Sequence, residues 1–490
     1  MSILPPEILG SVFRWNVTSD GDFGGLPKDS HNFLLVCHHW FEVASRTPDL
    51  WSFWGNKLQD WAPHHGRCGA APLDLVLAAP KYSNNDFDDK LRDALRDRAT
   101  RDLVRRVHLK GLRVSGLLNS IISSIVTEEE GTRSSRMESF IVLSACFLPV
   151  DVSAFFSRYR LPKLRCLRLI GCKISSWDLV RSHTMALTTL ELGYMKKSPA
   201  LSLPQLLSVL SSNPLLRYFG LSLISGPVPD VNHSDGSSPR VPLRHLKWLR
   251  LNSDFRPAFE LLNQLDLPDR MVNLRLKLFW SSPSDISRTL GMFLGDHVRR
   301  RGRLSGDRLG LLAYPSTYSF DFNVGVACKG DGSAEVTWFV EVSGSMTWEL
   351  EGEEVDRVCF DLISHIPRDQ VISLQTSIPI LRSKELCVEM RDLTYLHLVD
   401  GDLSVWFMEP DILGPHAFKD LLPGLDHIVI TGPILDSDDW SPLTKFLSHR
   451  AAAGNRISSL RLCNHPQMGR DVVKSIKRMV KVVDFGCGSP

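Results

Sequence analysis

The feature that most constrains the fold is an apolar pattern that recurs along the chain from residue 104 onward. Its clearest copy reads Leu164-x-x-Leu167-x-Leu169-x-x-Cys172-x-Ile174, and a second begins at Leu393. Within each copy the apolar residues alternate, which is typical of a short strand with one buried face. A single such unit cannot bury its apolar face alone, so successive units are expected to stack on one another.

The spacing of the copies is typical of leucine-rich repeats, whose period is about 20–29 residues. Successive predicted strand starts lie 23 to 38 residues apart, with one exceptional gap of 84 residues. Helical patterns lie between them, for example at 203–210 and 284–298. One strand and one helix per unit predict a solenoid, or horseshoe, of parallel strands. The predicted starts are Val104, Met137, Leu164, Leu187, Leu216, Leu246, Met271, Val355, Leu393, Leu425, Ile457 and Val480.

The exceptional gap contains a different pattern, at residues 311–350. Apolar residues alternate over 318–328 and again over 336–342, on either side of a turn at Gly330-Asp331-Gly332. One interpretation is a β-hairpin insertion that projects from the solenoid, where insertions often form a binding face. The other is a degenerate pair of repeats with long strands.

The N-terminal fifty residues contain more apolar side chains than two short helices can bury. Pro5 and Pro6 suit a first helical turn, and apolar residues at 8, 9, 12 and 13 form a stripe behind them. Ser30 can cap a second helix, in which apolar residues at 33, 36, 37, 40 and 44 share a face and which Thr47-Pro48 ends. The excess apolar surface needs the next domain, a partner, or both.

These residues resemble the F-box, in the form common in F-box-like proteins of mushroom-forming fungi. Residues 4–9 read LPPEIL and residues 34–51 read LLVCHHWFEVASRTPDLW. The second stretch matches the pattern V-C-x-x-W-x-x-x-A-x-x-x-P-x-L-W at every position, and residues 71–77 resemble the first strand after an F-box. The loop at 18–30 is longer than in a compact F-box, which leaves the spacing of the two helices open.

The resemblance implies a helical module that binds the Skp adaptor and, through it, a cullin. The chain would then be the substrate-recognition subunit of an SCF-type E3 ubiquitin ligase, and its repeat domain would bind a protein target whose contact residues we do not predict. Phe33 and Trp51 would pack within the module or against the first repeat. The expected adaptor-binding residues are Leu4, Pro5, Pro6, Ile8, Leu9, Val12, Phe13, Leu35, Val36, Cys37, Trp40, Ala44, Pro48 and Leu50.

Two other classes of function stay open from the residues alone. The first is a leucine-rich-repeat interaction scaffold without a ubiquitin role, whose N-terminal helices only cap the repeats. The second is an enzyme that uses an unrecognised thiol or histidine. No nucleophile elbow, phosphate-binding loop, dinucleotide fingerprint or zinc-protease motif is present, so we expect a protein that is not an enzyme and needs no cofactor or metal.

The composition limits which partners and which cellular compartment we expect for this chain. Lys and Arg exceed Asp and Glu by only two, which does not favour nucleic acid or a membrane surface as a partner. No apolar run reaches the ~18–20 residues of a membrane span, and no secretory signal is predicted at the start. Ten cysteines without a CxxC pair suit reduced thiols, so we expect a cytoplasmic or nuclear protein.

The predicted fold is therefore a small all-α F-box module followed by an α/β leucine-rich-repeat solenoid with a β-hairpin insertion. The expected domains are an F-box helical module at 1–54, a connecting segment with a first strand at 55–100, repeat units at 101–310, the hairpin insertion at 311–350, and repeat units with a C-terminal cap at 351–490.

Overall fold

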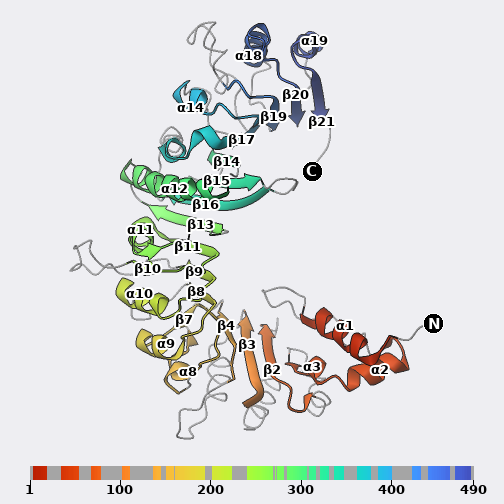
Figure 1. Cartoon of the computed structure of the whole chain (residues 1–490), viewed down its shortest axis with the longest axis vertical. Coiled ribbons are helices and arrows are strands. Elements are labelled where there is room, and N and C mark those ends of the chain that lie inside the picture. The colour runs from red at the N-terminus through yellow and green to blue at the C-terminus, as the bar shows by residue number, and fades with distance from the viewer. Residues whose placement is uncertain are drawn as a thin grey trace. The chain divides into compact units, whose positions relative to one another are not determined.

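The structure is a computed structural model of the whole chain (Figure 1). It describes residues 4–18, 35–54, 68–78, 102–110, 136–144, 150–158, 161–193, 201–222, 240–268, 271, 273–280, 284–305, 308–315, 321–329, 336–346, 361–376, 384–399, 422–431, 440–463 and 469–486.

The fold is mixed α/β with mostly parallel strands, and the chain divides into two compact units. Unit 1 comprises residues 1–246 and 260–267, and unit 2 comprises residues 247–259 and 268–490. The short helix α11 (Phe255–Asn263) spans the division.

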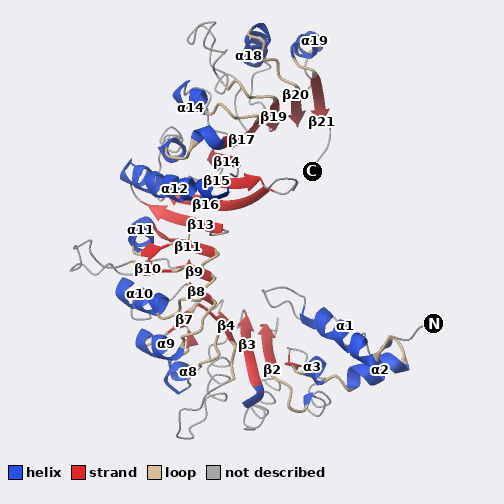
Figure 2. Cartoon of the chain, in the orientation of Figure 1, coloured by secondary structure: helices blue, strands red, loops and turns tan. Residues whose placement is uncertain are grey.

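In unit 1 the strands of the main sheet pair in parallel and in the order of the chain. The helices that connect the later strands lie along one side of them, as Figure 2 shows. The strands are β1 (Phe53–Trp54), β2 (Leu73–Ala78), β3 (Val104–Lys110), β4 (Ser139–Leu143), β6 (Cys166–Ile170), β8 (Thr189–Gly193) and β9 (Tyr218–Ser222). The helices beside them are α8 (Ser153–Arg158), α9 (Trp177–His183) and α10 (Leu203–Ser211), with short parallel pairs β5 (Val150–Asp151) with β7 (Cys172–Lys173) and β10 (Val241–Pro242) with β12 (Leu265–Asp266).

The apolar positions of the recurring pattern form the core. Leu167, Leu169, Cys172 and Ile174 are all buried, so the alternation in β6 points its leucines inward. A capping box at Ser202, with Gln205 as its partner, begins α10. The unit predicted from the pattern, an inward-facing strand followed by a helix, is confirmed here.

The opposite face of the unit 1 strands carries ionic contacts that link neighbouring strands. Arg168 on β6 bonds to Glu191 on β8 at 2.5 Å, and both side chains are largely buried. Arg105 on β3 donates two hydrogen bonds, of 3.1 and 2.8 Å, to Asp74 on β2. Bidentate guanidinium–carboxylate geometry makes this second pair the more specific of the two.

His108 lies on this same face of β3 and makes the stability of unit 1 depend on pH. Its Nε2 lies 2.9 Å from the Ser139 hydroxyl, and burial, reinforced by the charge of Arg106, lowers the pKa of His108 to about 4. Because the pKa is lower in the folded than in the unfolded state, the stabilisation is present above pH ~6.5 and is lost as the pH falls toward 4. We expect unit 1 to lose about 2–3 kcal/mol over that interval.

Chemical denaturation at a series of pH values measures this loss. His108→Gln, which keeps a hydrogen-bonding group but cannot be protonated, is expected to flatten the curve between pH 6.5 and 4. An unchanged pH dependence in that variant would exclude His108 as its source.

In unit 2 the strands follow a different order. The sheet runs β11 (Trp248–Asp254), β13 (Asn273–Trp280), β16 (Val336–Met346), β15 (Asp321–Lys329), β14 (Arg308–Pro315), β17 (Val371–Thr376), β18 (Tyr395–Val399), β19 (His427–Thr431), β20 (Ser459–Cys463) and β21 (Val482–Gly486). The helical elements are α12 (Ser284–Ser305), η3 (Arg368–Gln370), α14 (Lys384–Glu389), α18 (Ser441–Ala452) and α19 (Arg470–Met479).

The antiparallel hairpin expected between 311 and 350 is present, but it does not project from the sheet. β15 pairs antiparallel with both β14 and β16. β16 then pairs in parallel with β13, and β14 pairs in parallel with β17. The expectation of a projecting insertion is therefore corrected, because both outer strands of this meander are hydrogen-bonded into the sheet. The alternative of a degenerate pair of repeats does not fit either, because β15 runs antiparallel to both of its neighbours and successive repeat strands would pair in parallel.

Each predicted strand start among the described residues is followed by a strand no more than two residues later. Val355, the remaining predicted start, lies outside the described residues. The structure instead shows β17 at Val371–Thr376, which the pattern did not predict. The helices predicted at 203–210 and 284–298 are confirmed as α10 and α12.

Two glycines let α12 approach the segment that precedes β17. A Cβ on Gly291 would meet the ring of His365, and a Cβ on Gly295 would overlap the His365 carbonyl oxygen. The backbone of residues 361–366 therefore packs directly against α12. We expect Gly295→Ala to destabilise unit 2 by about 2 kcal/mol, because overpacking outweighs the gain in helix propensity.

Thermal and chemical unfolding followed by circular dichroism measure this effect. Gly10→Ala is the matched control, because it makes the same change inside a helix where the new Cβ meets only Thr47 Oγ1, at 3.4 Å. The control is expected to be neutral or slightly stabilising. Equal stability of the two variants would contradict the close approach at Gly295.

Candidate protein interface

The N-terminal helices form a module within unit 1. It consists of α1 (Pro6–Thr18), α2 (His38–Ser45) and α3 (Pro48–Trp51), and α1 packs on both of the others. Leu9 and Phe13 are fully buried, and the Phe13 ring meets Trp40 on α2 edge-on, with centroids 5.1 Å apart. An aromatic contact of this kind stabilises by about 0.5–1.5 kcal/mol beyond the area it buries.

Hydrogen bonds join α2 to α3 and α3 to the sheet. Trp51 Nε1 donates to the Ala44 carbonyl at 2.8 Å, and the Thr47 hydroxyl donates to the Val43 carbonyl, also at 2.8 Å. The Asp74 N–H on β2 donates to the Ser52 carbonyl at 2.8 Å, and β1 pairs in parallel with β2. Trp51 was predicted to pack within the module or against the first repeat, and its hydrogen bond to Ala44 on α2 and its exposure of only 4% place it within the module.

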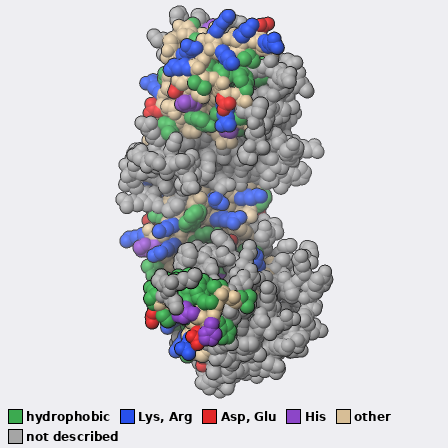
Figure 3. All heavy atoms as spheres, turned by 90° about the vertical axis from the view of Figure 1, so that its right-hand side faces the viewer, with side chains coloured by type: hydrophobic (Ala, Val, Ile, Leu, Met, Phe, Trp, Pro, Cys, Tyr) green, Lys and Arg blue, Asp and Glu red, His purple; other side chains and the backbone are tan. Residues whose placement is uncertain are grey.

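The module keeps an apolar surface exposed to solvent. Ile8 is 52% exposed and Leu35 is 81% exposed, and Leu4, Val12, Val36 and Phe41 are also exposed. His39 Nε2 lies 3.3 Å from the Leu4 carbonyl, which places the start of α2 beside the start of α1. The exposed residues of both segments therefore meet at one end of the module. Figure 3 shows hydrophobic side chains gathered into a patch in the lower half of the view.

The residues predicted to bind an adaptor fall into two groups. The exposed group is Leu4, Pro5, Pro6, Ile8, Val12, Leu35, Val36, Cys37 and Pro48, with Trp40 half-buried beside it. Leu9, Phe13, Ala44 and Leu50 are buried. The four buried residues can hold the helices in place for an interface, but they do not lie on the surface of the module. The expectation that they contact the adaptor directly is therefore corrected. The physical reason is that the apolar positions of α1 cover two faces of the helix, and only one of them packs inward.

The start of the second helix also differs from the expectation. Cys37 is an exposed N-cap residue with an extended backbone, and the helix begins at His38. Val36 and Cys37 therefore precede the helix instead of lying on its apolar face. Ser30, Phe33 and the loop after Thr18 lie outside the described residues.

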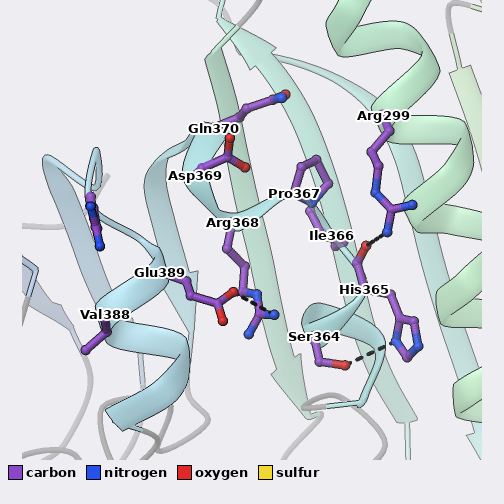
Figure 4. A pocket seen from close by; sticks show the side chains of 11 residues that line it. Arg299, Ser364, His365, Ile366, Pro367, Arg368, Asp369, Gln370, Val388 and Glu389 are labelled. Atoms are coloured by element: carbon purple, nitrogen blue, oxygen red, sulfur yellow. Dashed lines mark hydrogen bonds and ion pairs between the residues drawn. The ribbon is translucent and has the colours of Figure 1, made fainter.

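Unit 2 contains a pocket, which Figure 4 shows from close by. It is a cavity of about 630 Å³ lined by the end of α12, residues 364–370 and the end of α14. Arg299 donates to the His365 carbonyl and pairs with Asp296 at 3.1 Å, and Arg368 pairs with Glu389 at 2.7 Å. Each of these two guanidinium groups is paired with a carboxylate, so neither offers an uncompensated charge to a ligand. Arg299 also links α12 to the segment 364–370, and Arg368 links that segment to α14.

Among the residues that the structure describes, the side chains do not assemble a metal-binding group of three or more His, Cys, Asp or Glu. Burial raises the pKa of the Cys172 and Cys387 thiols to about 12, so both stay protonated near neutral pH. None of the described helices combines the length and the apolar character that crossing a membrane requires. The exposed apolar surface of the N-terminal module is thus the candidate site, since a contiguous apolar patch is stabilised when it is removed from water.

Comparison with known proteins does not assign this site. The chain matches no family model, and a search of curated proteins finds no relative.

Proposed function

We propose that this chain is the substrate-recognition subunit of an SCF-type E3 ubiquitin ligase. In this proposal the module of α1, α2 and α3 is an F-box that binds the Skp adaptor and, through it, a cullin. The strand-and-helix units bind a protein target. The protein would act in the cytoplasm, the nucleus or both.

The observation that supports the proposal is the exposed apolar surface of the module. Leu4, Ile8, Val12, Leu35 and Val36 are large apolar residues whose side chains remain in contact with water. Four of them lie in the two stretches, 4–9 and 34–51, that resemble an F-box, and Val12 follows the first stretch on the same helix. Complete burial of an exposed side chain of this size contributes about 1.5–3 kcal/mol, and these five, already partly covered, would each contribute part of that to an interface.

The proposed architecture for target binding is a leucine-rich-repeat solenoid in each unit. It is supported by parallel strands that recur in the order of the chain, by a buried leucine ladder through Leu169, Leu192 and Leu221, and by helices on one side of the strands. Stacked units of this kind offer an extended row of outward-facing strand residues, which is suited to holding a protein segment.

The mechanism in this proposal is positional, and the chain itself is not an enzyme. Holding a target near the ubiquitin-carrying enzyme raises the effective concentration of one reactant for the other. The reactive thiol and the activated ubiquitin belong to the other subunits. The buried Cys172 and Cys387 of this chain, with raised pKa values, are consistent with such a passive role.

Co-purification tests the proposal. Tagged full-length chain is expected to retain a co-expressed Skp adaptor and its cullin, and the triple variant Pro5→Ala, Ile8→Asp, Trp40→Ala is expected to lose both. Circular dichroism of the variant shows whether the strands and helices of the two units survive. Failure of the folded wild-type chain to retain the adaptor would instead favour a leucine-rich-repeat scaffold without a ubiquitin role.

A further inference from the structure

The outward face of β11 and β13 carries an unusual set of side chains. The burial of β11 alternates strictly over its first four residues, so that Trp248 and Arg250 are exposed while the leucines between them are buried. On β13 the exposed positions are Arg275 and Lys277. Both strands belong to unit 2 and pair in parallel, with Arg250 directly opposite Arg275. Parallel neighbours lie only ~4.8 Å apart, and like charges at that separation repel.

Two of these cations have no counter-ion among the side chains that the structure describes. None of the ion pairs that the structure describes includes Arg250 or Lys277, and Lys277 Nζ instead lies 5.9 Å from the centroid of the Phe279 ring. Asp254, at the end of β11, is the acidic residue on the outward face of these two strands, and it is opposite Phe279 in the register. Arg275 is opposite Glu341 on β16 in the register. The face therefore keeps a net positive charge at Arg250 and Lys277.

Aromatic residues lie at both ends of this charged stretch. Trp248 is 42% exposed at the start of β11, and Phe279 is partly exposed near the end of β13. Trp and Arg are the residues that most often dominate the energy of protein interfaces, and an exposed Trp beside unpaired cations is a poor arrangement for a surface that only meets water. Figure 3 shows Lys and Arg side chains gathered in a band across the middle of the view, at the level of β11 and β13.

We propose that this face, named here the β11–β13 face and made of Trp248, Arg250, Arg275, Lys277 and Phe279, binds an acidic segment of the target protein. This inference rests on the proposed function, because it states which chemistry the target-binding domain recognises. Carboxylates of the segment lie over Arg250 and Lys277, and apolar residues at its ends contact Trp248 and Phe279. The six steps from Trp248 to Asp254 span ~20 Å, so the segment is about six to seven residues long in an extended conformation.

Charge and aromatic groups act differently in this complex. Arg250 and Lys277 attract the acidic segment over a distance of about one Debye length, so binding weakens as salt rises. Trp248 supplies apolar contact area that salt does not screen, so removing it weakens binding at every salt concentration.

Fluorescence anisotropy with the full-length chain tests the inference. The probe is a fluorescein-labelled Glu-rich peptide with an apolar residue at each end, and its counterpart has Gln in place of every Glu. The Glu peptide is expected to bind at least about tenfold more tightly than the Gln peptide at low salt. Arg250→Glu with Lys277→Glu is expected to remove that preference. Lys474→Glu, an exposed charge reversal on α19, is the matched control and is expected to keep it.

Three results would overturn the inference. They are equal binding of the Glu and Gln peptides, unchanged preference in the double variant, and tighter binding of single-stranded RNA than of the Glu peptide, which would make the face a nucleic-acid surface. Adaptor binding is measured on the same samples. Equal binding of the Glu and Gln peptides by a wild-type chain that binds the adaptor contradicts this inference alone, and absence of adaptor binding in a wild-type chain that keeps the peptide preference contradicts the proposed F-box function alone.

Discussion

The single substitution Ile8→Asp is expected to weaken binding of the Skp adaptor by about a hundredfold or more while the chain stays folded. Ile8 is 52% exposed on α1, so a carboxylate there is solvated in the free chain and costs the fold little. In the complex the same carboxylate would be buried against apolar groups without a counter-ion. The free-energy cost of desolvating the carboxylate therefore weakens binding, and the stability of the free chain changes little.

The control for this prediction is Met292→Asp. Met292 on α12 is 57% exposed, so the chemical change and the starting exposure are both closely matched, and adaptor binding is expected to stay at the wild-type level. Leu35→Asp is expected to behave like Ile8→Asp. Wild-type affinity in both Ile8→Asp and Leu35→Asp would show that the exposed apolar surface does not contact the adaptor. Surface plasmon resonance with immobilised adaptor measures all four proteins in one experiment.

Arg450→Ala is expected to destabilise unit 2 by about 3–5 kcal/mol, because it combines the loss of charged hydrogen bonds with an internal cavity. Arg450 on α18 is 1% exposed, and its guanidinium donates to the carbonyls of Leu422 and Leu425, each at 3.0 Å. It also lies 5.8 Å from the centre of the Phe446 ring, and burial lowers its pKa to about 10. Arg450 stays charged at neutral pH and holds the turn before β19, where Leu422 has a φ of +50°.

Arg461→Ala is the control for Arg450. Arg461 pairs with Asp484 at 3.3 Å, but both side chains are 55% exposed, so its removal is expected to change stability by less than about 0.5 kcal/mol. Arg450→Lys is expected to destabilise nearly as much as Arg450→Ala, since an ammonium group does not span both carbonyls as a guanidinium does. Denaturant unfolding of the three variants measures the differences. Equal stability of the Arg450 and Arg461 variants would contradict a structural role for the buried guanidinium.

The strands with regular alternation were predictable from the sequence. The position of β6 was predicted from Leu164, Leu167 and Leu169. The strand begins two residues after the predicted start, because Leu164 lies in the turn that precedes it. The same reasoning missed β17. Its pairing with β14 shifts register between Leu309 and Gly310, so buried Val371 and Leu374 are three residues apart instead of two. A local irregularity of this kind removes the period by which a strand is recognised.

The order of strands in unit 2 could not be predicted, because it depends on pairings between distant segments. β13 meets β16, which lies more than sixty residues further along the chain, and the pattern within each strand contains no information about that choice. The candidate interface was predictable only in part. Apolar residues at 8, 9, 12 and 13 indicate a helix that is apolar on two faces, but which face packs inward is decided by Trp40 meeting Phe13. The β11–β13 face was not predicted at all, since an isolated Arg or Trp in a strand carries no signal until the register places it beside others.

The most direct test of the central claim is a calorimetric titration of the purified full-length chain with purified Skp adaptor. We expect a complex of one chain with one adaptor and a Kd of about 1 µM or tighter, in line with a surface of several fully covered apolar side chains. A folded chain that shows no binding heat and no complex on size exclusion at tens of micromolar would contradict the claim that α1 and the start of α2 form an adaptor-binding F-box.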